Sequence, residues 1–109
     1  MSDAEFKALK ENLLPVFIAL VNSLFDEDYA LFLKHHPPAP KTEFDRAVSI
    51  LKPSGKPEKV EYLGHAVKVG GVKMLCKVTY SNTAEELLWD FNLIAEGGNY
   101  KLVNMGFDK

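Results

Sequence analysis

The N-terminal part of the chain has apolar residues at helical spacing. Between residues 6 and 25 they recur at steps of three or four, which predicts a broad amphipathic helix. The positions that set this stripe are Phe6, Leu9, Leu13, Phe17, Leu20 and Leu24. Pro15 lies inside it. Because proline has no amide hydrogen and crowds the preceding turn, we expect either a kink there or a short helix followed by a second start.

A second, shorter helix is predicted after an acidic turn. The Asp-Glu-Asp group at residues 26–28 can cap a helix over residues 29–34, which would bury Leu31 or Phe32. The following stretch, residues 35–40, contains two histidines and three prolines. We expect an extended break there, since closely spaced prolines cannot continue a helix.

A third helix is predicted over residues 42–51, where Thr42 and Asp45 resemble a capping box ahead of further apolar positions. The Pro-Ser-Gly-Lys-Pro segment at residues 53–57 then closes the helical half. We interpret it as a loop inside one domain, because neither half of the chain alone has a two-sided core.

Beyond residue 59 the period of the apolar positions changes from helical spacing to two. Apolar and polar residues alternate over residues 72–80 and again over residues 87–95, which predicts two half-buried strands. Gly70-Gly71 and Gly97-Gly98 stand where two-residue hairpin turns are needed. Glycine suits such turns because it accepts positive φ angles.

Two more strands are predicted, over residues 60–69 and 100–107. In the first, the apolar set changes parity between Tyr62 and Leu63. We therefore expect a bulge near Gly64 that restores the register and bends the sheet.

The predicted order, helices first and then a meander of four antiparallel strands, defines an α+β fold. We expect a single domain over residues 1–109, with N-terminal helices packed on a curved four-stranded sheet. The helices can cover only one face of such a sheet. The cone-shaped space between helix and sheet is the expected pocket.

Composition narrows the classes of partner. The 109 residues include 13 Lys and Arg and 15 Asp and Glu, for a net charge of -2, and 47% are hydrophobic. These values suit one compact domain and argue against disorder. Because no cluster of basic residues offers a face for phosphates, we expect no nucleic-acid partner. No stretch approaches the roughly 20 apolar residues that span a bilayer, so we expect no contact with a membrane.

The single cysteine, Cys76, excludes an intrachain disulfide and a cysteine-rich zinc site, and it favours a reducing compartment. The polar residues 1–7 do not resemble a signal peptide, so we expect a cytoplasmic protein. An exported chain whose signal peptide had been removed would look the same.

The pattern as a whole resembles the nuclear transport factor two-like (cystatin-like fold) superfamily, and in particular its small bacterial members of unknown function. The resemblance rests on the helix ending at Phe25, the acidic turn at residues 26–29, Phe44 in the third helix and the hairpins over residues 60–107. It covers nearly the whole chain and is a likeness of architecture. It implies a curved sheet wrapped around the N-terminal helix, in a protein that often dimerises through its sheet.

The same resemblance leaves the function open. The superfamily includes steroid isomerases, dehydratases, polyketide cyclases, binding proteins and structural dimer modules, and a shared fold does not choose among them.

Two residues are weak candidates for acid–base chemistry. His65 shares a strand face with apolar residues and could act as a general acid or base, or it could simply be held by a backbone carbonyl at the sheet edge. Asp90 lies between Trp89 and Phe91. Desolvated there, it could abstract a proton from a carbon acid. Alternatively, it lies with Asn92 on an exposed face, paired with Lys73 or Lys77.

We expect aromatic and polar side chains from the first helix and the strands to line the pocket. They are Phe17, Tyr62, Tyr80, Trp89 and Asn92. Tyrosine hydroxyls can donate hydrogen bonds to a ligand, although tyrosine also occurs in strands for packing reasons. His35 and His36 lack a third ligand at recognisable spacing, so we expect no metal and no cofactor.

Three functions are compatible with this sequence. The first is a non-enzymatic domain that binds a small apolar molecule or a peptide. The second is a cofactor-free isomerase, dehydratase or cyclase that uses Asp90 or His65 with a tyrosine, and the third is a purely structural dimer module. In each case we expect a homodimer, because both faces of the strand at residues 87–95 need cover.

Overall fold

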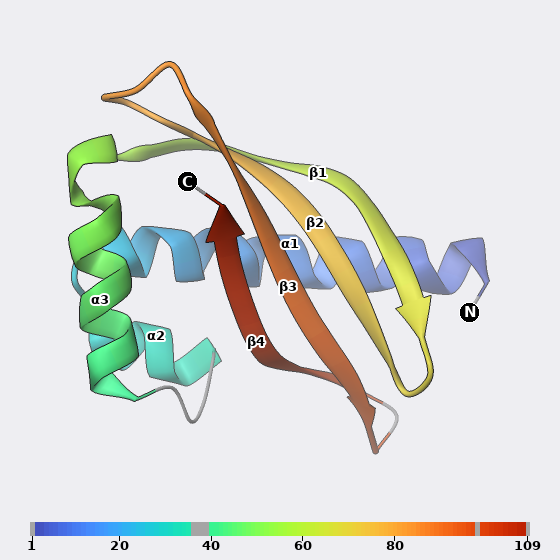
Figure 1. Ribbon diagram of the computed structural model, residues 1–109. Coiled ribbons are helices and arrows are strands. Elements are labelled where there is room, and N and C mark those ends of the chain that lie inside the picture. The colour runs from blue at the N-terminus through green and yellow to red at the C-terminus, as the bar shows by residue number, and fades with distance from the viewer. Residues whose placement is uncertain (1, 36–39, 98, 109) are drawn as a thin grey trace.

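The computed structural model describes residues 2–35, 40–97 and 99–108 and confirms the α+β fold, with helices followed by an antiparallel meander (Figure 1). The elements in chain order are α1 (Asp3–Phe25), α2 (Tyr29–His35), α3 (Lys41–Leu51), the 3-10 turn η1 (Lys52–Ser54), β1 (Pro57–Lys68), β2 (Gly71–Tyr80), β3 (Glu86–Glu96) and β4 (Asn99–Asp108).

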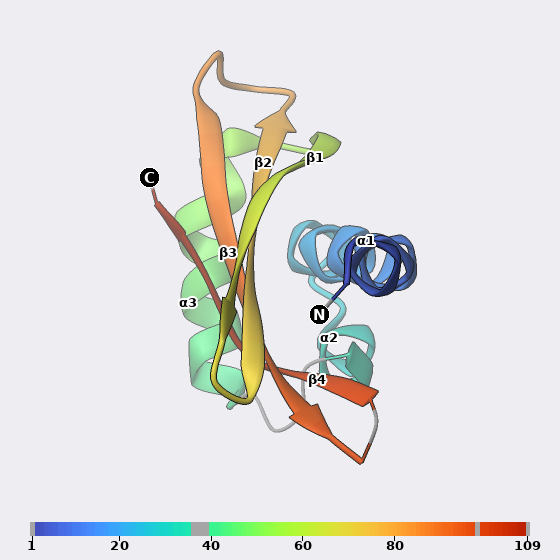
Figure 2. The ribbon, with the colours of Figure 1, turned by 90° about the vertical axis from the view of Figure 1, so that its right-hand side faces the viewer.

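The four strands form one sheet in the order β1-β2-β3-β4, with every neighbouring pair antiparallel. α1 crosses one face of this sheet and α2 lies on the same side, while α3 stands at one end, beside β4 (Figures 1 and 2). The opposite face of the sheet is not covered by any described helix. We call it the open face.

α1 runs without interruption through Pro15, so the alternative of a second helix start is wrong. Its first turn is capped by Ser2, whose Oγ accepts a hydrogen bond from the Glu5 amide at 3.2 Å. A proline inside a helix removes one backbone hydrogen bond. Packing of the helix against the sheet compensates for that loss, because Phe17, two residues further on, is completely buried.

Among the described helices, α1 is long and apolar enough, by length and composition alone, to cross a membrane. The expectation that no segment approaches this limit is therefore wrong for α1. This is weak evidence for a membrane span, since a core helix of a water-soluble protein passes the same test. In the fold, Leu20, Val21 and Leu24 of this helix are buried.

The predicted capping box at the start of α3 is also wrong. The helix begins one residue earlier than expected, with Pro40 at the N-cap and no side-chain capping bond. Thr42 therefore lies inside the first turn, where its hydroxyl cannot cap that turn. The carboxylate of Asp45 instead accepts a hydrogen bond from Lys41 Nζ at 2.5 Å.

The first hairpin turn uses Gly70 but not Gly71. Gly70 has a φ of 76°, as a tight turn requires, whereas Gly71 already belongs to β2. A Cβ on Gly71 would lie 2.3 Å from the carbonyl oxygen of Leu93, so this glycine allows close approach of β2 and β3. In the other predicted turn, Gly97 has a φ of 58° and Gly98 lies outside the described residues.

The predicted bulge in β1 is confirmed, since the register with β2 shifts between Tyr62 and Gly64. Tyr62 pairs with Cys76 and His65 pairs with Met74, both of which are buried on the helix side. The bulge therefore brings Tyr62 and His65 to the same face of the sheet, although they are three residues apart.

The core lies between α1 and the helix side of β2 and β3, and its members alternate along each strand as predicted. Phe17 of α1 stacks on Phe91 of β3 with ring centroids 3.8 Å apart. The buried residues of β2 and β3 are Val72, Met74, Cys76, Val78, Tyr80, Leu87, Trp89, Phe91 and Leu93.

Candidate functional site

A cavity with a volume of about 230 Å³ lies where the end of α1 meets α3, η1 and the last residue of β2. Its walls are largely apolar, with two charged residues, Glu27 and Lys52, which are exposed and so lie at the rim. The lining residues are Val21, Leu24, Phe25, Glu27, Val48, Leu51, Lys52, Gly55 and Tyr80. We call this space the α1–α3 cavity.

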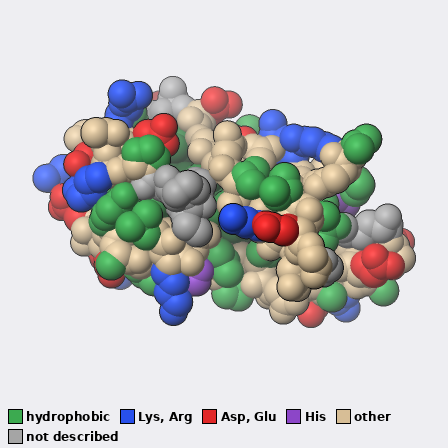
Figure 3. All heavy atoms as spheres, turned by 90° about the horizontal axis from the view of Figure 1, so that it is seen from below, with side chains coloured by type: hydrophobic (Ala, Val, Ile, Leu, Met, Phe, Trp, Pro, Cys, Tyr) green, Lys and Arg blue, Asp and Glu red, His purple; other side chains and the backbone are tan. Residues whose placement is uncertain are grey.

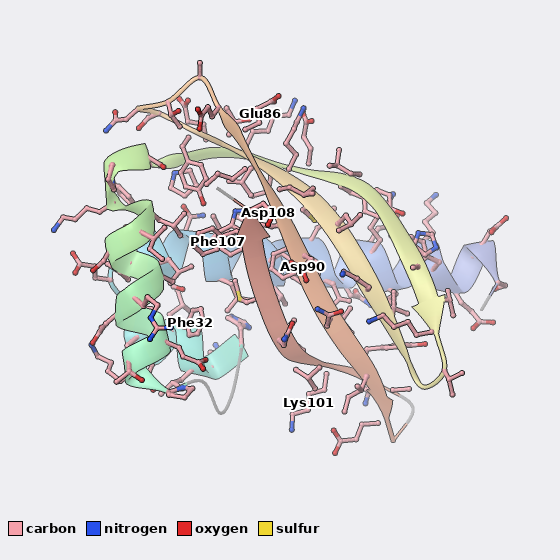
Figure 4. All side chains as sticks on the ribbon, in the orientation of Figure 1. Phe32, Glu86, Asp90, Lys101, Phe107 and Asp108 are labelled. Carbon is pink, nitrogen blue, oxygen red and sulfur yellow. The ribbon has the colours of Figure 1, made fainter. Side chains whose placement is uncertain are left out.

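A smaller cavity of about 80 Å³ adjoins it, since Leu24 contributes to both. Trp89 and Phe107 of the sheet and Phe32 and Phe44 of the helices are among the residues that line it. In Figure 4, Phe107 extends from β4 toward α3.

Two buried polar atoms lie close to these cavities. The Tyr80 hydroxyl and the Trp89 indole nitrogen have no hydrogen-bond partner in the described part of the chain. Burial raises the pKa of Tyr80 to about 12, and its neighbour Trp89 opposes this rise.

His65 and Tyr62 meet at the other end of α1. The Tyr62 hydroxyl and His65 Nδ1 share a hydrogen bond of 2.5 Å, and the imidazole stacks on Phe6 with ring centroids 3.4 Å apart. Lys10 Nζ lies 4.7 Å from the centre of the Tyr62 ring. Burial, and to a lesser extent Cys76, raise the pKa of Tyr62.

This cluster is far from the α1–α3 cavity. His65 contacts Phe6, whereas the cavity is lined by Leu24, and 18 helical residues at about 1.5 Å each separate these positions by roughly 27 Å. His65 is also exposed. The histidine and the cavity therefore cannot act on the same small molecule.

Asp90 and Asn92 lie on the open face, away from the cavity. Asp90 Oδ2 is 4.0 Å from Lys73 Nζ and accepts a hydrogen bond of 3.1 Å from Asn92 Nδ2. The same amide donates to Asn104 Oδ1 at 2.7 Å. This arrangement corresponds to the exposed-face alternative for Asp90 and not to a desolvated base.

The five residues expected to line one pocket are thus in different places. Tyr80 lines the α1–α3 cavity and Trp89 the smaller one, while Phe17 is a core residue stacked on Phe91. Tyr62 and Asn92 belong to the His65 cluster and the open face, respectively. Glu27 and Lys52 were missed by sequence reasoning because no motif marks them.

No metal centre is formed by the described residues, because they contain no group of three or more His, Cys, Asp or Glu side chains that could hold an ion. His35 ends α2, and His36 lies outside the described ranges. Cys76 is buried, and this burial raises the pKa of its thiol to about 11. A thiol of this kind is a poor nucleophile at neutral pH.

A comparison with protein-family models and with curated proteins finds no match to this chain.

Proposed function

We propose that this protein binds a small, largely apolar molecule in the α1–α3 cavity and does not catalyse a reaction. The observation that carries this proposal is the cavity itself, about 230 Å³ with apolar walls. Drug-sized ligands occupy pockets of roughly 300–1,000 Å³, so a cavity of this volume suits a smaller molecule. A peptide segment would need a longer groove, which favours the small molecule over the peptide.

The distribution of titratable groups supports binding over catalysis. An acid–base enzyme needs at least two polar groups that converge on a substrate in a water-excluding site. Asp90 lies on the open face and His65 lies at the far end of α1. Tyr80, a tyrosine that could assist either of them in catalysis, lines the cavity instead. The groups that a cofactor-free isomerase would use are therefore separated by the body of the domain.

Filling the cavity provides the test. In Val48→Trp the indole is expected to occupy the space and to abolish binding of 4-methylpentan-1-ol, a small apolar probe, because Val48 lines the cavity from α3. Amide chemical-shift changes on titration would report both the affinity and the location. In the wild type, the shifts are expected at α1, α3 and Tyr80.

Ser49→Trp is the matched control, because Ser49 is the next residue of α3 and its side chain is exposed. It adds the same indole outside the cavity and should leave the titration unchanged. If Val48→Trp folds and binds the alcohol as the wild type does, the α1–α3 cavity is not the binding site.

We also propose that the protein forms a homodimer through the open face. Half-exposed apolar residues, including Leu88 and Ile94, lie there among charged ones. The face is electrically polarised from end to end. Figure 4 shows Glu86 and Asp108 toward one end, Asp90 near the middle and Lys101 toward the other end.

The strand register extends this polarity over the whole open face. The end near Glu86 carries three acidic residues, Glu61, Glu86 and Asp108, and two lysines, and Lys77 binds Glu61 at 3.2 Å and Glu86 at 2.9 Å. The opposite end carries two lysines, Lys68 and Lys101, and one acidic residue, and the Lys73–Asp90 pair lies between the two ends. If two copies are related by a twofold axis through the middle of the sheet, the acidic end of each copy lies on the basic end of the other.

The side of the molecule viewed in Figure 3 has no continuous basic patch, because basic and acidic side chains are interspersed there. A self-complementary face therefore supports a second copy of this chain as the partner of the open face, in preference to a nucleic acid.

The dimer predicts a strong effect at Leu75, which lies half-buried in the middle of the open face opposite Asp90. Leu75→Glu would place a carboxylate close to its own copy across the twofold axis, so like-charge repulsion should convert the dimer to a monomer in sedimentation velocity. Val69→Glu, in the exposed hairpin turn, is the control and should remain dimeric. A monomeric wild type at micromolar concentration would disprove the interface.

A further inference from the structure

Glu27 has a backbone conformation that normally belongs to glycine. Its φ is 55°, in the left-handed region, and no other described non-glycine residue has a positive φ. The residue follows the end of α1, where the Asp28 amide donates to the Ser23 carbonyl at 2.9 Å and the Asp26 amide donates to the Asn22 carbonyl at 2.8 Å. This is the Schellman arrangement, whose left-handed position glycine fills most readily.

Glu27 also borders the cavity described above. Glu27 lines the α1–α3 cavity, and Lys52, the first residue of η1, lines it as well. Neither residue makes an ion pair or a side-chain hydrogen bond with any part of the chain that the structure describes. Two residues of opposite charge therefore border one apolar space without an ion pair between them.

We propose that Glu27 and Lys52 select a small zwitterion, an α-amino acid with an apolar side chain, as the ligand of this cavity. The inference rests on the proposed binding function. The apolar side chain would occupy the space between Leu24, Val48 and Leu51, the ammonium group would bind Glu27, and the carboxylate would bind Lys52.

The charges on the rim favour a zwitterion over simpler ligands. A purely cationic ligand would be attracted by Glu27 but repelled by Lys52. A purely anionic ligand would be attracted by Lys52 but repelled by Glu27. A ligand with both charges satisfies both residues.

Four related compounds test this inference by calorimetric titration of the full chain. They are L-leucine, 4-methylpentanoate, which lacks the ammonium group, 3-methylbutan-1-amine, which lacks the carboxylate, and 4-methylpentan-1-ol, which carries neither charge. We expect leucine to bind about tenfold or more tightly than each of the other three, as a charge-assisted contact provides. Glu27→Gln should lower leucine affinity to that of 4-methylpentanoate, and Lys52→Gln should lower it to that of the amine.

Glu27→Gly separates a binding role from a structural one. Glycine should raise the Tm, because it accepts the left-handed conformation without strain, and should still reduce leucine affinity about tenfold or more. Glu11→Gln, an exposed carboxylate on α1 outside the cavity, is the control and should change neither value. A higher Tm with unchanged leucine affinity would overturn the role of Glu27.

The outcomes distinguish this inference from the function on which it rests. If the alcohol binds as tightly as leucine and Val48→Trp abolishes both, the cavity is a binding site and the selection of a zwitterion is wrong. If Val48→Trp folds and leaves all four titrations unchanged, the cavity function fails as well.

Discussion

Trp89→Ala is expected to lower the free energy of unfolding by about 3–5 kcal/mol, the range for removing a large aromatic side chain from a core. Trp89 is 1% exposed and packs on Phe107 of β4, with ring centroids 4.7 Å apart. The substitution would also enlarge the neighbouring cavity of about 80 Å³, and the loss of stability rises with the volume of the cavity that remains. Urea unfolding followed by far-UV circular dichroism measures the loss.

Trp89→Phe is the matched control. It keeps an aromatic ring in the core and removes the indole N–H, which has no partner among the described residues. Since an unpaired buried donor stabilises nothing, we expect a loss well below that of the alanine variant. If Trp89→Ala lowers the free energy of unfolding by less than about 1 kcal/mol, the average for any substitution, then Trp89 is not central to the packing of the core.

Phe17→Ala is expected to be comparably damaging, at about 3–5 kcal/mol. Phe17 is completely buried, and its ring is parallel to that of Phe91 to within 9°. This stack joins α1 to β3, so its loss should loosen the contact between the helix layer and the sheet. The free energy of unfolding from urea titration is again the measurement.

The same helix provides the control for this prediction. Phe6→Ala removes the same side chain near the start of α1, where the ring is half-buried against the exposed His65. We expect a loss of about 1 kcal/mol there, typical of a partly exposed site. Equal losses at the two positions would contradict the location of the core.

Local sequence determined the elements of this fold because their signals depend on neighbouring residues only. The helical spacing through Phe17 and Leu24 predicted α1. Alternation around Cys76, broken only at Leu75, and around Trp89 predicted β2, β3 and their buried faces. The parity change after Tyr62 even located the bulge, since a single inserted residue is the simplest way to return apolar side chains to one face.

Element boundaries were less accessible to the sequence, because several residues can compete for the same role. Thr42 has the chemistry of a cap, yet α3 begins earlier and Asp45 pairs with Lys41. Gly70 and Gly71 suit a turn equally well by composition. Only the approach of Leu93 shows that the second glycine is needed in the strand.

The candidate site was decided by tertiary structure alone. Tyr80 and Trp89 were recognisable from sequence as aromatic strand residues, but the α1–α3 cavity arises where the end of α1, α3 and η1 fail to fill the space beside β2. Residues as distant in sequence as Glu27 and Lys52 border it because the chain reverses at the acidic turn. Periodicity records which face of an element is buried, whereas a cavity depends on how whole elements are placed relative to one another, and no local pattern encodes that placement.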